Sequence, residues 1–148
     1  MMSTNVDDRI NTVTIRVPTE NQIREIAGLY RAQGWWQGGD DESPQLIPRL
    51  ITGSHCFVVA LEGEDIVGMG RAISDGVSDA YIQDLTVRSD YRNQGIGRRI
   101  LQTLLERLHA DGLHWIGLIA EPGSDGLYRW AGFQEMSACV PMLMKQTP

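Results

Sequence analysis

The most informative part of the chain is Val87-Arg88-Ser89-Asp90-Tyr91-Arg92-Asn93-Gln94-Gly95-Ile96-Gly97-Arg98-Arg99. It lies between a segment with strand character, residues 80–87, and the longest amphipathic helical pattern, which begins near Gly95. Glycines at such a junction let the backbone approach a ligand, and unpaired N–H groups at a helix start favour an anion. Four arginines surround the turn. The stretch therefore predicts a phosphate or pyrophosphate site; the alternative is a tight turn with a solvated basic rim.

The type of phosphate ligand can be narrowed from the residues around the turn. The Walker pattern GxxxxGK[ST] is absent, and the only lysine is Lys145, which excludes an ATP-binding P-loop. The dinucleotide fingerprint GxGxxG fails because Ile100 stands at its third glycine, and Gly117 lies near the position of the acidic ribose ligand. Coenzyme A remains as the candidate ligand.

Length and composition indicate one soluble globular domain. The chain has 148 residues, of which 42% are hydrophobic and 22% are charged, so we expect a single domain over residues 1–148 with about residues 1–10 as a flexible N-terminus. The net charge of −6 disfavours nucleic acid and anionic membranes as partners. The N-terminus does not resemble a secretory leader, and the longest apolar run is residues 56–61, so we expect a cytoplasmic protein.

The hydrophobic pattern predicts an α/β fold (a mixed α+β sheet) with helices on both faces. We expect strands near residues 13–17, 57–61, 66–73, 80–87 and 113–120, and a final extended stretch from residue 133. We expect helices after a capping box formed by Thr19 and Gln22, after Ser43-Pro44, from Gly95 to Gly112, and over residues 124–131. Pro48 should bend the second of these helices or delay its start.

Two segments resemble motifs of the GNAT N-acyltransferase family. Residues 92–97, Arg-Asn-Gln-Gly-Ile-Gly, are similar to its R/Q-x-x-G-x-G/A motif, and residues 82–87 resemble its central strand. Residues 127–133, Leu-Tyr-Arg-Trp-Ala-Gly-Phe, are similar to its F/L-Y-x-x-x-G-F segment. The resemblance covers the order of elements along the whole chain and is strongest over residues 80–134. It implies a GNAT-like fold and acetyl-CoA-dependent transfer of an acetyl group to a primary amine.

The resemblance also assigns the co-substrate site. It implies that backbone groups of Leu85 and Val87 bind the pantetheine arm and polarise the thioester carbonyl, and that residues 94–98 hold the pyrophosphate. The residues it assigns to acetyl-CoA are Leu85, Thr86, Val87, Arg92, Asn93, Gln94, Gly95, Ile96, Gly97 and Arg98. One departure is that the asparagine common in the family after the strand ending at Ala120-Glu121 is missing.

Tyr128 matches the general acid of the family, which protonates the departing thiolate; its alternative role is a core aromatic beside Trp130 and Phe133. Asp84 on the central strand is the first candidate for the general base, and Glu121 is the second. A buried carboxylate has a raised pKa and can accept the proton of an amine, directly or through water, but either carboxylate could instead be structural.

Trp35 and Trp36 are the candidate acceptor-binding residues. They precede Gly38-Gly39 and three acids, residues 40–42, in a connection that by family likeness forms part of the acceptor wall. Indole faces attract cations, and the acids raise the local concentration of positive charge. We therefore expect a cationic, partly apolar amine, on a small molecule or a peptide; the alternative is that both rings pack under the loop.

Cys56 and Cys139 lie in apolar surroundings, so we expect small buried hydrophobes, and neither has a motif that would activate a thiolate. Transfer should therefore be direct, without a covalent enzyme intermediate. The histidines form no ligand pattern, so we expect no metal. A homodimer is left open. The alternative function is a catalytically silent module on the same fold that binds acyl-CoA or a protein partner.

Overall fold

The computed structural model describes residues 6–36 and 43–145 of the chain. By internal contacts the chain divides into two compact units, Met1–Leu118 and Ile119–Pro148. The first unit contains the sheet, and the second contains one short helix, so the two units are described separately below.

A five-stranded sheet organises the first unit, with the strand order β1-β2-β3-β4-β5. The strands are β1 (Ile10–Thr14), β2 (Cys56–Glu62), β3 (Asp65–Ser74), β4 (Asp79–Val87) and β5 (Trp115–Gly117). The first three pairings are antiparallel, and β4 pairs with β5 in parallel. The mixed sheet predicted from the sequence is therefore confirmed.

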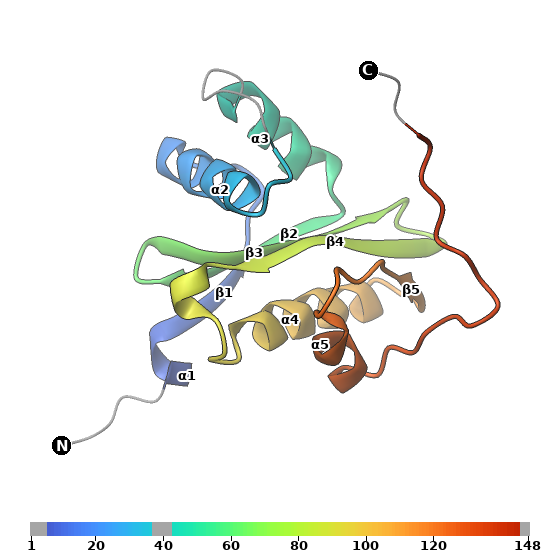
Figure 1. Ribbon diagram of the computed structural model, residues 1–148. Coiled ribbons are helices and arrows are strands. Elements are labelled where there is room, and N and C mark those ends of the chain that lie inside the picture. The colour runs from blue at the N-terminus through green and yellow to red at the C-terminus, as the bar shows by residue number, and fades with distance from the viewer. Residues whose placement is uncertain (1–5, 37–42, 146–148) are drawn as a thin grey trace. The chain divides into compact units, whose positions relative to one another are not determined.

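Helices cover both faces of this sheet, as predicted. Figure 1 shows α2 and α3 on one face and α4 on the other. The helices of the first unit are α1 (Val6–Arg9), α2 (Glu20–Ala32), α3 (Ser43–Gly53) and α4 (Ile96–Ala110), with a 3-10 turn, η1 (Ser89–Tyr91). The capping box of α2 is present, because the Thr19 hydroxyl accepts from the Gln22 N–H and the Gln22 side chain accepts from the Thr19 N–H.

Two glycines of β3 set the distance between α4 and the sheet. A Cβ at Gly68 would lie 2.8 Å from Ile100 Cδ1, and one at Gly70 would lie 3.0 Å from Ile100 Cγ2. Met69, between them, is buried in the cluster that includes residues of α2 and α3. Successive side chains of β3 point to opposite faces of the sheet. The two glycines therefore let α4 pack closely on one face, while the Met69 side chain fills space on the other face.

Several boundaries differ from the prediction. The first strand lies three residues earlier than expected and leaves Val17 87% exposed. Residues 6–9 of the expected flexible N-terminus are helical, and α3 begins at Ser43 with Pro48 inside it, so its start is not delayed. The fifth strand has three residues instead of eight, since its ladder with β4 consists of three pairs, from Asp79 with Trp115 to Tyr81 with Gly117.

The described residues of the second unit contain the helix α5 (Asp125–Trp130), which confirms the short helix expected there. No strand follows α5 in residues 133–145, where the sequence predicted an extended stretch ending the fold. Cys139 is exposed, contrary to the expectation of burial, because no regular element surrounds its apolar neighbours. Cys56 is buried at the start of β2, as expected.

Candidate active site

The glycine turn connects β4 to α4 and has the geometry expected of an anion site. Gly95 is the N-cap of α4 and adopts the left-handed region at φ 80°, and Asn93 adopts it at φ 62°. Nothing lies within 4 Å of a Cβ built at Gly95, so its backbone is open to a ligand. Asn93, Gln94 and Gly95 are exposed, and the first N–H groups of a helix such as α4 have no intrahelical acceptors.

The four arginines around this turn have different surroundings. Arg88 is paired with Asp90 at 2.7 Å, and its guanidinium lies 5.0 Å from the centre of the Tyr91 ring. Arg92 donates from Nε to the Val87 carbonyl at 3.1 Å, which holds it at the end of β4. Arg98 and Arg99 lie in the first turn of α4. Arg88 is therefore largely neutralised by its own carboxylate, whereas Arg92 is placed between the strand end and the turn.

A β-bulge interrupts β4 where the co-substrate arm was expected. Met69 pairs with Thr86 and Arg71 pairs with Gln83, so two residues of β4, Asp84 and Leu85, face one residue of β3. Asp84 adopts φ 58°, which marks the bulged position. The ladder between β4 and β5 ends at Tyr81, and in the described chain residues 82–87 have no strand partner on that side. This free edge can pair with an extended ligand that carries amides.

The bulge also places Asp84 in a polar network beneath α2. Its Oδ2 accepts from Arg71 Nε at 2.6 Å and from the Tyr30 hydroxyl at 2.7 Å. Arg71 further donates to the Ser54 hydroxyl at 3.3 Å and to the Gln83 side chain at 3.0 Å. Asp84 therefore has an ion-pair and hydrogen-bonding role in the structure, the alternative that the sequence analysis left open. Its carboxylate is stabilised by an arginine and a phenol.

Tyr30 joins this network to the tryptophans. Its ring stacks on Trp36 with centroids 4.7 Å apart and meets Trp35 edge-on at 6.0 Å. Both tryptophans are half-buried and pack against the core cluster. Burial, followed by the charge of Asp84, raises the pKa of Tyr30 well above its ordinary value, so the phenol remains a donor. The three expected acids, residues 40–42, lie outside the described residues.

Tyr128 lies in α5 of the second unit and is half-buried. Its ring meets Phe133 edge-on with centroids 6.0 Å apart, and its carbonyl accepts from the Phe133 N–H at 3.0 Å. Burial, followed by the charge of Glu121, raises the pKa of the phenol above its ordinary value. Tyr128 is therefore protonated at neutral pH, a requirement for a proton donor, while Glu121 itself is exposed.

Sequence reasoning missed Tyr30 and Arg71, which hold Asp84. In the sequence Tyr30 falls on the apolar face of the helical pattern that follows Thr19, which gives no sign of a polar partner. The available signal for Arg71 was a charged residue inside the apolar strand Ile66–Ile73, since a charge at such a position needs a partner. In the described residues no three His, Cys, Asp or Glu side chains form a metal-binding group. No described helix is long and apolar enough to cross a membrane.

Comparison with known proteins identifies the family. Residues 20–133 match the acetyltransferase (GNAT) family, and the chain belongs to it. GCN5-related N-acetyltransferase 1, chloroplastic, of Arabidopsis thaliana is 37% identical over 67 residues, which are 45% of this chain and 34% of that protein. The L-methionine sulfoximine/L-methionine sulfone acetyltransferase of Pseudomonas aeruginosa is 43% identical over 72 residues, 47% of this chain and 41% of that protein.

The fold is likewise shared with solved structures. The GNAT family acetyltransferase SP0256 of Streptococcus pneumoniae is 26% identical, with a TM-score of 0.73 over 94% of this chain and 99% of that chain. The family and fold that the two sequence motifs indicated are therefore confirmed. The matched segments cover less than half the length of the two curated relatives named above.

Proposed function

We propose that the protein is an acetyl-CoA-dependent N-acetyltransferase that moves the acetyl group directly from the thioester to a primary amine. The observation that carries this proposal is the combination of the exposed glycine turn at the start of α4 with the free, bulged edge of β4. One binds a pyrophosphate and the other binds an extended amide-containing arm, and coenzyme A contains both groups. Membership of the GNAT family supports the same reading.

In this proposal the co-substrate lies along the end of β4 and the glycine turn. The pyrophosphate accepts hydrogen bonds from backbone N–H groups of residues 94–98, and Arg92 and Arg98 add positive charge. The pantetheine arm pairs with backbone groups over residues 85–87, of which Thr86 is buried and its two neighbours are half-buried. A backbone N–H directed at the thioester oxygen would stabilise the negative charge that develops during acyl transfer.

The amine of the acceptor must lose a proton, and we assign its capture to Asp84. The hydrogen bonds from Arg71 and Tyr30 both go to Oδ2, so neither of these partners occupies Oδ1. That oxygen can attract an ammonium group and receive its proton, directly or through water. Tyr128, protonated at neutral pH, would return a proton to the leaving thiolate.

The acceptor we propose is a cationic amine with an apolar portion. Support comes from the contacts of Trp35 and Trp36 with Tyr30, whose hydroxyl binds Asp84. The Trp36 ring is stacked on Tyr30, and the Trp35 ring meets it edge-on. Aromatic faces and a carboxylate both favour cations. The Pseudomonas relative is named for acetylation of L-methionine sulfoximine and L-methionine sulfone, which supports a small-molecule acceptor.

The proposal is tested by incubating the purified chain with acetyl-CoA and a panel of amines, amino acids and peptides while measuring free CoA thiol. Thiol release that requires a primary amine is expected. Binding of acetyl-CoA without thiol release from any acceptor would instead support the silent module, which the family membership does not favour. For the acceptor wall, Trp36→Ala should raise the acceptor KM, whereas Trp115→Ala, which removes a 54% exposed indole from β5, should not.

A further inference from the structure

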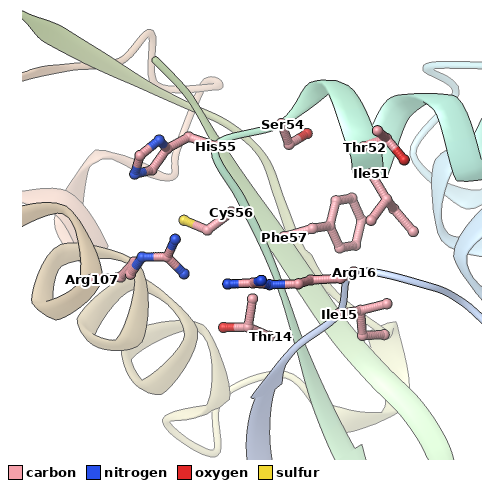
Figure 2. A pocket seen from close by; sticks show the side chains of 10 residues that line it. All are labelled: Thr14, Ile15, Arg16, Ile51, Thr52, Ser54, His55, Cys56, Phe57 and Arg107. Carbon is pink, nitrogen blue, oxygen red and sulfur yellow. The ribbon is translucent and has the colours of Figure 1, made fainter. Parts of the chain in front are cut away.

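A second basic cavity lies at the other end of α4 from the glycine turn. It has a volume of about 300 Å³ and is bounded by the end of β1, the end of α3, the start of β2 and Arg107 of α4 (Figure 2). Arg107 follows Gly97 by ten residues of helix, which corresponds to roughly 15 Å along the helix axis. The cavity is therefore separate from the turn assigned to coenzyme A.

Positive charge converges on this cavity. Figure 2 shows the guanidinium groups of Arg16 and Arg107 directed toward each other, with Cys56 beside the space between them. Like charges that share one cavity repel each other unless an anion lies between them. Among the described residues no carboxylate lines the cavity, although the chain as a whole carries a net charge of −6. The local excess of cations is therefore a specific feature of this end of the unit.

The neighbouring carboxylate does not neutralise both arginines. Asp111 Oδ2 accepts from Arg107 Nε at 2.7 Å and contacts His55 Nε2, also at 2.7 Å. Arg107 keeps its two terminal nitrogens for another acceptor, because only Nε is used by Asp111. Arg16 is exposed and has no ion pair among the described residues. Within the described residues, one positive charge at the cavity thus has no ion-pair partner.

Cys56 does not supply the missing negative charge. Its thiol is buried, and this burial raises the pKa of the thiol, although the nearby Arg107 acts in the opposite direction. The thiol is therefore neutral at physiological pH, and the cavity keeps its positive potential.

We propose that this cavity binds a small molecule through a phosphate or carboxylate group held between Arg16 and Arg107. Guanidinium groups bind planar or tetrahedral oxyanions through paired N–H donors, and two arginines converging on one space suit such a group. The volume is at the lower end of the range for small-molecule sites, so the ligand is the size of a simple metabolite and not of a nucleotide cofactor.

The test is a residue-resolved NMR titration of the full, isotope-labelled chain with inorganic phosphate and, separately, with succinate at constant ionic strength. Saturable shifts at the amides of Arg16 and Cys56, with a Kd of about 1 mM, are expected for at least one probe. The probe that binds more tightly identifies the oxyanion class. Shifts confined to residues 94–98, or shifts without saturation, would overturn the proposal.

Arg16→Ala should raise that Kd at least about tenfold while the spectrum shows a folded protein, because Arg16 is exposed and lies outside β1. Arg49→Ala is the matched control: it removes an exposed arginine from α3 that does not line the cavity, and the Kd should not change. An unchanged Kd in Arg16→Ala, or equal weakening in both variants, would contradict an arginine-bound anion.

Discussion

The ion pair of Arg71 with Asp84 permits a quantitative prediction, because it can be compared with a second arginine–aspartate pair in the same unit that is much more exposed. Arg71 Nε lies 2.6 Å from Asp84 Oδ2, and the two side chains are 15% and 21% exposed. Arg88 Nη2 lies 2.7 Å from Asp90 Oδ2, and those side chains are 41% and 58% exposed. At nearly equal distance, the difference in energy comes from the dielectric around each pair.

Arg71→Met should lower the free energy of unfolding by about 3 kcal/mol, because it leaves a largely buried carboxylate without its cation. Arg88→Met should lower it by less than about 1 kcal/mol, since solvent screens the exposed pair. Urea denaturation followed by circular dichroism at neutral pH measures both values.

A double-mutant cycle isolates the origin of that cost. If the uncompensated carboxylate is responsible, Arg71→Met combined with Asp84→Asn should be more stable than Arg71→Met alone, with a coupling energy above about 1 kcal/mol. The reasoning is refuted if Arg71→Met costs no more than Arg88→Met, or if the two single effects simply add.

Three further predictions concern the turn, the proton donor and the packing of α4. Gly95→Ala and the matched Gly63→Ala both place a side chain at positive φ in open space, so each should lower the free energy of unfolding by about 1–2 kcal/mol. Only Gly95→Ala should also raise the Kd for CoA, by about tenfold. Equal CoA affinities of the two variants would show that the turn is not part of the site. Tyr128→Phe should lower kcat on the order of 100-fold with unchanged acetyl-CoA affinity, and a wild-type kcat in this variant would make Tyr128 a packing residue. Because the pKa of Tyr128 is raised above its ordinary 10.0, the kcat of the wild-type enzyme should not fall through loss of this proton below pH 10.0. Gly70→Ala should destabilise the protein by about 1–3 kcal/mol, because its Cβ would lie 3.0–3.1 Å from side chains of α4. Gly28→Ala has nothing within 4 Å of its Cβ and should stabilise α2. A higher melting temperature for Gly70→Ala than for Gly28→Ala would contradict the packing argument.

The sequence was sufficient for the elements whose signals are local. The capping box at Thr19 and the glycine turn at Gly95 depend on residues within a few positions of each other, and both are where they were expected. The length of β5 could not be read from its apolar pattern, because the ladder ends at the pair of Tyr81 with Gly117 although β4 continues to Val87. The end of β5 is set by pairing between segments more than thirty residues apart, as the pair of Tyr81 with Gly117 shows.

In the candidate site, too, features with a local sequence signal could be predicted, and features that depend on distant residues could not. The turn residues and Tyr128 could be proposed from motifs, whereas the surroundings of Asp84 could not be predicted. Its bulged backbone at φ 58° has no sequence signal here, because glycine or asparagine would be the usual residue at such a position. Its partners, Tyr30 and Arg71, are 54 and 13 residues away in the chain. The partners of this carboxylate could therefore be found only from the structure.

The central claim, direct acetyl transfer from the thioester to an amine, is tested most directly with acetyl-CoA labelled in its acetyl group. Mass spectrometry of the product and of the intact protein is measured with and without a primary amine acceptor. The account predicts labelled N-acetylated product, and protein of unchanged mass when the acceptor is omitted. Label retained on the protein at Cys56 or Cys139, or labelled acetate without an acetylated amine, would contradict it.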